Sequence, residues 1–199
     1  MQNELVSFVS PELHLTASDP ALLETLQRPH LALFWGAHTP TRALLTMLTI
    51  LAARGQTLRV FDGGNRFDGY FVARLARRMS THPQTVLRRV HLSRAFTCFQ
   101  LAELIESMPA EPDPLFVLDM LSTFYDESVP LRDTARLLET TITHLKRLAS
   151  VGPVIVGARE PRAPAQARWA LLDRLQVVAD TAWLLRAPEE MGAEQPRLF

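Results

Sequence analysis

The stretch from His30 to Ala43 contains residues whose spacing could hold phosphate groups. It reads HLALFWGAHTPTRA: an apolar segment runs into a glycine-led turn, and a helix is expected to follow. This is the layout of the pattern G-x-x-x-x-G-K-[ST], in which backbone N–H groups cradle phosphates while the lysine and the hydroxyl contact phosphate and Mg²⁺. Gly36 occupies the first position. Thr41, Arg42 and Ala43 stand where the second glycine, the lysine and the Ser/Thr belong, so the layout is retained and the chemistry is changed.

Asp119 is the one acidic group at a position where such a site needs one, because it directly follows the apolar segment 115–118. It is either an indirect ligand that supports Mg²⁺ without direct contact or a loop aspartate that accepts hydrogen bonds from nearby backbone. Arg42 likewise has two interpretations, residual phosphate binding or a solvated helix arginine. The candidate nucleotide-binding residues are Gly36, Ala37, His38, Thr39, Thr41, Arg42 and Asp119. None of the six histidines has a metal-ligand spacing, so no metal ligands are predicted.

Strands and helices alternate along the elements that must position these residues. The apolar runs predict strands at 30–35, 58–61, 90–92, 115–118 and 154–157, and a strand or strand pair at 177–185. Helical spacing predicts helices at 20–27, 40–54, 68–79, 85–89, 99–108, 131–150 and 168–174. Strands without polar alternation are typical of parallel sheets buried on both faces. We therefore expect an α/β three-layer sandwich with a mostly parallel central sheet and strand 30–35 near its middle.

Two helix details follow from the same patterns. Asp19 is placed to cap the helix at 20–27, which would begin with Pro20. The apolar face of the helix at 68–79 is expected to consist of Tyr70, Phe71, Leu75 and Ala76.

Composition places the chain among ordinary globular proteins. It has 199 residues, 47% of them hydrophobic and 21% charged, with zero net charge and one cysteine. No disulfide within the chain is possible, and neither a signal peptide nor a membrane-spanning run is expected, so the sequence predicts a cytoplasmic protein without a membrane partner. The predicted organisation is an N-terminal extension at 1–29, a core domain at 30–186 and a C-terminal tail at 187–199.

Five segments together resemble the core ATPase domain of RecA-type recombinases, a superfamily that includes their archaeal and eukaryotic relatives and KaiC-like proteins. The resemblance covers about 31–186. Its segments are the strand–loop–helix at 30–54, DGGNRF at 62–67, SRAFT at 93–97, LFVLDMLSTFY at 115–125, and a long helix ending HLKRLA before an apolar strand. The resemblance implies a P-loop NTPase core of the RecA-like type.

The resemblance also implies that hydrolysis is lost. Working members of the superfamily orient the attacking water with a glutamate after the second strand, and that position falls here on Gly63 or Gly64. With the loop lysine and the metal-binding hydroxyl also missing, we expect a pseudo-ATPase without catalytic residues, for which ATP or ADP binding stays open. The function expected first is an accessory or regulatory protein in DNA recombination or repair that acts through partners. The alternatives are a slow divergent ATPase of the RecA family, and a KaiC-like regulatory or structural protein unrelated to DNA.

Charge is unevenly distributed along the chain. Residues 54–94 carry nine arginines against two aspartates, whereas residues 95–140 carry nine acidic residues against two arginines. This pattern indicates either two surfaces for oppositely charged partners or ordinary solvated helix faces. The expected partner is another protein, a RecA-family recombinase or a second copy of the chain, and DNA is a further candidate. The candidate nucleic-acid or partner contacts are Arg74, Arg77 and Arg78 on one side of a helix, and Arg159, Arg162 and Arg168 in a basic loop.

Overall fold

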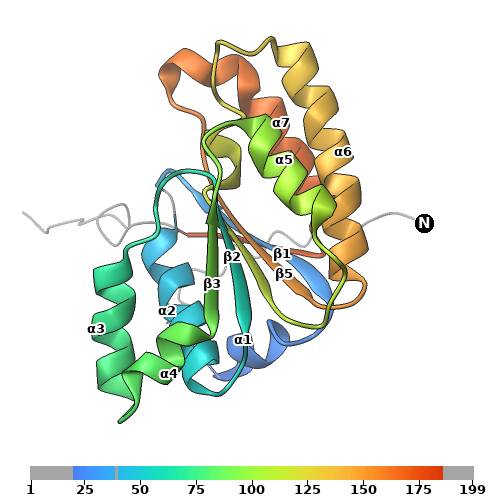
Figure 1. Ribbon diagram of the computed structural model, residues 1–199. Helices are drawn as coiled ribbons and strands as arrows, with labels where there is room; N and C mark the ends of the chain where they lie inside the picture. Colours follow the sequence, from blue (N-terminus) through green and yellow to red (C-terminus); the bar gives the residue numbers. More distant parts are fainter. Residues whose placement is uncertain (1–19, 39, 186–199) are drawn as a thin grey trace, which may run out of the picture.

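A six-stranded sheet forms the centre of the molecule (Figure 1). The computed structural model describes residues 20–38 and 40–185. The strands are β1 (His30–Gly36), β2 (Leu58–Asp62), β3 (Val90–Arg94), β4 (Leu115–Leu118), β5 (Pro153–Arg159) and β6 (Thr181–Leu184). Every pair of neighbouring strands is parallel, in the order β3-β2-β4-β5-β1-β6. The predicted parallel α/β sheet is therefore confirmed.

The position of β1 differs from the prediction. We expected it near the middle of the sheet, but it lies next to the edge, between β5 and β6. The central pair is β4 and β5. The difference arises because β2, β3 and β4 all lie on the far side of β5, and only β6 adds to the outer side of β1, with Ala32 opposite Thr181. The strand predicted from 177 is shorter than expected, since Val177 and Val178 belong to the preceding helix and Val178 packs into the core.

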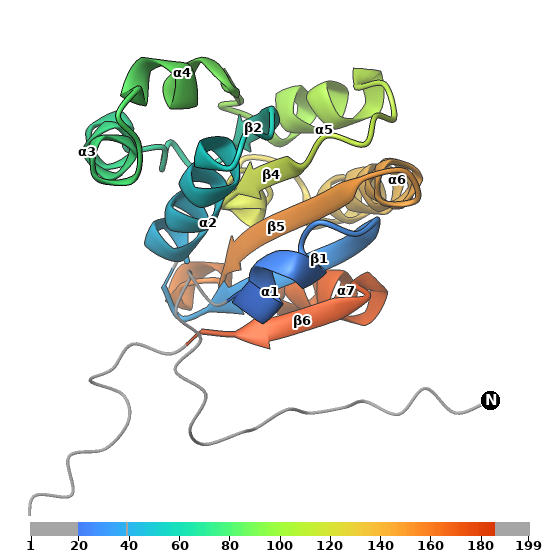
Figure 2. The ribbon, with the colours of Figure 1, turned by 90° about the horizontal axis from the view of Figure 1, so that it is seen from below.

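Helices cover both faces of the sheet, as expected for a three-layer arrangement (Figure 2). One face packs against α1 (Pro20–Thr25), α2 (Thr41–Ala53), α3 (Gly69–Met79) and α4 (Pro83–Arg88). The other packs against α5 (Cys98–Ser107), α6 (Leu131–Ala149) and α7 (Trp169–Val178), with short 3₁₀ turns at Met120–Ser122 and Ala163–Arg168. The side chains of β1 alternate between these layers, with Leu31 and Leu33 on the α6 side and Ala32 and Phe34 on the α2 side.

The orientation of α3 corrects one prediction. Its buried residues are Val72 and Ala76, whereas Tyr70, which we placed on the apolar face, is 93% exposed. The helix begins where Asp68 accepts a hydrogen bond from the backbone N–H of Phe71, at 2.9 Å. Tyr70 lies two positions before Val72 and therefore on the opposite side of the helix from the residues that face the sheet. The aromatic ring of Tyr70 is thereby left in solvent.

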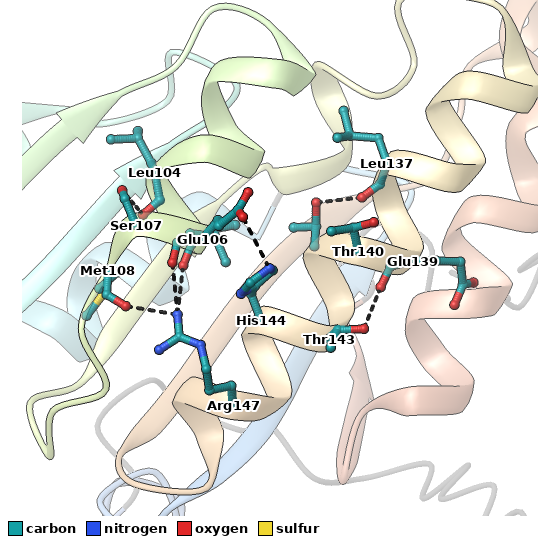
Figure 3. A network of polar contacts seen from close by, with 12 residues as sticks. Leu104, Glu106, Ser107, Met108, Leu137, Glu139, Thr140, Thr143, His144 and Arg147 are labelled. Carbon is teal, nitrogen blue, oxygen red and sulfur yellow. Dashed lines mark hydrogen bonds and ion pairs between the residues drawn. The ribbon is translucent and has the colours of Figure 1, made fainter.

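A single arginine joins α5 to α6 on the opposite face (Figure 3). The guanidinium of Arg147 in α6 donates to the backbone carbonyls of Glu106 and Met108 at 3.1 and 2.9 Å, and to that of Ile105 at 3.5 Å. These carbonyls lie at the C-terminal end of α5, where the helix leaves its acceptors without partners of its own. His144, one turn earlier in α6, faces Glu106 at 3.9 Å. The contact orients α5 relative to α6.

Several predictions fall outside the described residues. They are the cap at Asp19, the loop residue Thr39, and most of the N-terminal extension and C-terminal tail. Within the part that the structure describes, no helix is both long and apolar enough to cross a membrane.

Candidate functional site

All six strands end at the same edge of the sheet, because they are parallel, and ligand sites of open α/β sheets lie at that edge. Five charged side chains gather there from four neighbouring strands: Asp62 and Arg94 end β2 and β3, Arg66 follows β2, Asp119 follows β4, and Arg159 ends β5. We call these five residues the edge cluster. It contains two fully buried carboxylates and three guanidiniums.

Asp62 organises the loop that follows β2. Its two carboxylate oxygens accept hydrogen bonds from the backbone N–H groups of Arg66 and Phe67, at 2.8 and 2.9 Å. The Nε of Arg94 approaches the same carboxylate at 3.6 Å from the neighbouring strand. Asp62 therefore closes the loop into a tight turn and aims the side chain of Arg66 across the edge of the sheet.

Asp119 forms ion pairs with two arginines of the edge cluster. Its Oδ2 lies 3.3 Å from the Nε of Arg66, and its Oδ1 lies 3.7 Å from the Nε of Arg159. The residue has a φ of 48°, a left-handed conformation that aspartate tolerates better than most residues. Because the carboxylate is removed from water, its charge is stabilised by positive charge at short range. Here the guanidiniums provide that charge.

Gly64 makes this arrangement possible. A Cβ placed on Gly64 would overlap the carboxylate of Asp119 and would lie 2.6 Å from the Cβ of Asp119. The loop after β2 therefore passes directly against Asp119, and only a residue without a side chain fits there. Of the two positions onto which the resemblance puts a catalytic glutamate, Gly64 faces the carboxylate of Asp119, whereas a Cβ on Gly63 would meet the backbone carbonyl of Asp119 at 3.4 Å.

Arg159 is fixed by groups from the segment after β4. Its Nη2 donates to the hydroxyl of Ser122 at 3.0 Å, and its backbone carbonyl accepts a hydrogen bond from the hydroxyl of Tyr125 at 2.9 Å. Burial raises the pKa of Tyr125 above its ordinary value, and the negative charge of Asp119 adds to this effect. Tyr125 is thus a neutral donor with a structural role.

The glycine-led turn lies at the same edge. Gly36 is buried, and its carbonyl accepts a hydrogen bond from the N–H of Glu160 at 2.8 Å. Ala37 and His38 are exposed, and α2 begins at Thr41 with Pro40 before it and no side-chain cap. Beginning a helix after a glycine-led turn agrees with the predicted layout.

Arg42 points toward α3. Its guanidinium carbon lies 5.7 Å from the centre of the Phe71 ring, and that of Arg74 lies 6.0 Å from the same ring. Both are cation–π distances. The structure thus brings the arginine at the lysine position together with α3.

The six predicted contact arginines fall into different environments. Arg74, Arg77 and Arg78 are exposed on α3, and Arg162 is exposed in the loop after β5, whereas Arg159 belongs to the edge cluster. Arg168 is buried: it donates to the carbonyls of Phe124 and Val129 and to the hydroxyl of Thr134. We therefore assign Arg168 a structural role, because its guanidinium is used by the chain itself.

Sequence reasoning did not group the members of the edge cluster. Asp62, Arg66 and Arg94 appeared only within matching segments, and Arg159 was predicted as a nucleic-acid or partner contact and not as a partner of Asp119. A signal was present, because Asp62 and Asp119 both follow apolar strands and their strands are neighbours in the sheet. The strand order that makes them neighbours could not be obtained from the sequence alone.

Comparisons with known proteins identify no family. No protein-family model matches the chain, and a search of curated proteins finds no match. Among the described residues, no group of three or more His, Cys, Asp or Glu side chains is arranged to hold a metal ion. The interpretation of the site therefore rests on its own geometry.

Proposed function

We propose that the chain is a RecA-like P-loop domain that has lost ATP hydrolysis and acts as an accessory or regulatory protein in DNA recombination or repair by binding a protein partner. The observation that carries the proposal is the pairing of Asp119 with Arg66 and Arg159. In the superfamily that the sequence resembles, the acidic residue after this strand belongs to the Mg²⁺ site. In this chain, the buried carboxylate of Asp119 is paired with the arginine side chains of the same chain.

A hydrolysing site needs Mg²⁺ to bridge the phosphates, and the metal is held by a hydroxyl and a carboxylate. Arg66 and Arg159 compensate the charge of Asp119, each facing one of its two carboxylate oxygens. Ala43 has no hydroxyl to offer, and Gly64 leaves no room for a glutamate beside Asp119. Each change removes stabilisation of the transition state, and together they support the loss of turnover.

Nucleotide binding without hydrolysis is compatible with this arrangement. The N-terminal end of α2 carries backbone N–H groups that suit an anion, and no acidic residue lies in its first turn. The hydroxyl of Thr41 is buried there and has no hydrogen-bond partner among the described residues. A phosphate at this turn would therefore meet donors, whereas the metal-dependent step would lack its ligands.

Binding to a protein partner is supported by exposed aromatic side chains near the start of α5. Phe96 and Phe99 are 73% and 55% exposed, and Phe99 lines a shallow hollow with Leu137 of α6. Exposed aromatic groups of this kind are typical of interaction surfaces. The hollow also contains the exposed side chains of Asp133 and Arg136 on α6, so both charges border these aromatic groups.

The test of lost hydrolysis is phosphate release from ATP and Mg²⁺ by the purified chain. We expect the same background rate for the wild-type chain and for Asp119→Asn, with Arg132→Gln as an exposed control. Circular dichroism checks that each variant is folded. A metal-dependent rate that disappears in Asp119→Asn and persists in Arg132→Gln would show that the site still hydrolyses ATP.

The test of the partner is co-purification of the tagged chain from its native cells, with and without nuclease. Recombination or repair proteins that remain bound after nuclease treatment would support the proposal. Phe99→Ser should reduce their recovery. If no such protein is recovered, a regulatory role without a link to DNA becomes the better explanation.

A further inference from the structure

A second arginine-rich region lies on the outer side of α3, beside the loop that carries Arg66 of the edge cluster. Four exposed residues, Tyr70, Arg74, Arg77 and Arg78, share this side, since they stand at positions i, i+4, i+7 and i+8 of the helix. We call these four residues the α3 surface. The chain from Gly69 to Arg94 contains six arginines and no acidic residue.

The arginines of the α3 surface have no carboxylate to compensate them. Among the described residues, no ion pair involves Arg74, Arg77 or Arg78. The guanidiniums of Arg74 and Arg42 instead flank the ring of Phe71. The positive charge of the α3 surface is therefore available to an anionic ligand. The ring of Phe71 orients Arg74 of this surface and the neighbouring Arg42.

Tyr70 adds an aromatic face to this charge. Its side chain is 93% exposed, although rings of this size normally bury most of their surface. It lines a hollow of about 760 Å³ at the start of α3, together with Arg66, Phe67 and Arg77. Asp68 also lines the hollow, and its Oδ1 is already used to accept the N–H of Phe71.

From these observations we infer that the α3 surface binds single-stranded nucleic acid. The ring of Tyr70 stacks on a base, and Arg74, Arg77 and Arg78 contact the phosphates on either side. Non-specific single-strand sites combine these two elements, a basic track and an aromatic platform. One turn of α3 rises about 5.4 Å, which spaces its arginines for successive phosphates.

Other ligands fit this surface less well. A duplex keeps its base faces stacked inside, so an exposed ring would have nothing to stack on. A stable protein interface buries about 800 Å² on each partner around a core of several apolar groups. The α3 surface offers one aromatic ring among three cations. The inference goes beyond the proposed function, because it assigns a direct nucleic-acid contact that depends neither on hydrolysis nor on a protein partner.

The experiment is fluorescence anisotropy of labelled single strands with the full chain at increasing salt. Oligo(dT) and oligo(U) distinguish DNA from RNA, and binding of either supports the inference. Three phosphate contacts predict a slope of about −2 in a plot of log affinity against log salt. Arg77→Gln should reduce that slope by about 0.7, whereas Arg132→Gln on α6 should leave it unchanged.

Tyr70→Ala separates stacking from simple charge attraction. It should weaken binding roughly 5- to 150-fold with little change in the salt slope, and Tyr70→Trp should restore it. Tyr70 and Arg77 are both exposed, so the variants at these two positions should melt at the wild-type temperature. The inference is overturned if neither single strand binds, if a duplex binds equally well, if polyglutamate competes as well as oligo(dT), or if Tyr70→Ala binds normally. None of these outcomes changes the phosphate-release or co-purification results that test the proposed function.

Discussion

The edge cluster and the α3 surface are both rich in arginine, and they use it in opposite ways. In the edge cluster, Arg66 and Arg159 contact a fully buried carboxylate. On the α3 surface, Arg74, Arg77 and Arg78 are exposed and have no acidic partner in the described chain. The first set stabilises the fold around Asp119, whereas the second offers uncompensated charge to a ligand.

This difference shows that residue type and spacing do not decide the role of an arginine. What decides it is whether the neighbouring backbone brings a buried acceptor within reach. Arg168 makes the same point, because it belongs to a loop that looks basic in the sequence and yet its guanidinium is enclosed by acceptors. Substitutions in the two regions should therefore affect different measurements.

The largest effect is expected for Asp119→Ala. Removing the carboxylate leaves Arg66 and Arg159 without their buried partner, and alanine is less tolerant of the left-handed backbone at this position. We expect a loss of about 4 kcal/mol in the free energy of unfolding, measured with urea. Glu111→Ala is the matched control, because its ion pair with Arg59 is half-exposed on both sides and should contribute less than about 1 kcal/mol. Equal losses in the two variants would mean that the edge cluster is no more important than a surface pair.

The second-largest loss in the free energy of unfolding is expected for Arg168→Gln. The guanidinium donates to the carbonyls of Phe124 and Val129 at 2.8 and 2.6 Å, and glutamine is too short to reach both. Leaving these acceptors unsatisfied should cost about 3 kcal/mol. Arg162→Gln, in the same loop but exposed, should stay within about 0.5 kcal/mol of the wild type. If Arg162→Gln were the more destabilising change, the distinction between buried and exposed arginines in this loop would be wrong.

The different environments of Arg168 and Arg162 show how much of the structure could be predicted from the sequence. Apolar runs and helical spacing were sufficient for the parallel α/β fold and for most element positions, because burial on both faces leaves a continuous apolar signal. They were insufficient for the strand order, since the pairing of β2 with β4 and of β4 with β5 depends on contacts between segments far apart in the sequence. The edge cluster depends on that order, so its members could not be grouped beforehand.

The α3 surface was partly predictable for a similar reason. The spacing of Arg74, Arg77 and Arg78 placed them on one side of a helix, and that is confirmed. The exposure of Tyr70 was not foreseen, because an aromatic residue at helical spacing with Phe71 and Ala76 is more often part of a core. The buried side of the helix is instead defined by Val72 and Ala76, and Tyr70 lies on the side opposite Val72.

Gly64→Ala tests the close approach between the loop after β2 and Asp119. The added methyl group would overlap the carboxylate, and the loop is held in place by the two hydrogen bonds to Asp62. We expect a loss of about 2 kcal/mol in thermal or urea unfolding. Gly69→Ala is the matched control, because the nearest atom to its added methyl group is a carbon of Phe67 at 3.9 Å. A stable Gly64→Ala variant would indicate that the edge cluster can move apart at little cost.

The smallest effect is expected for Arg42→Gln, and it decides to which region Arg42 belongs. If its guanidinium rests on the ring of Phe71, the substitution should lower the free energy of unfolding by about 0.5 kcal/mol. A double-mutant cycle with Phe71→Leu should then give a coupling energy close to that value. Arg74 shares the ring and provides a second cycle whose coupling should be similar. Adding ATP to each variant extends the comparison. If ATP raises the melting temperature of the wild type and not of Arg42→Gln, while the cycle with Phe71 shows no coupling, then Arg42 serves the glycine-led turn as a phosphate contact. Coupling without an ATP effect would instead assign Arg42 to the positively charged side that includes the α3 surface.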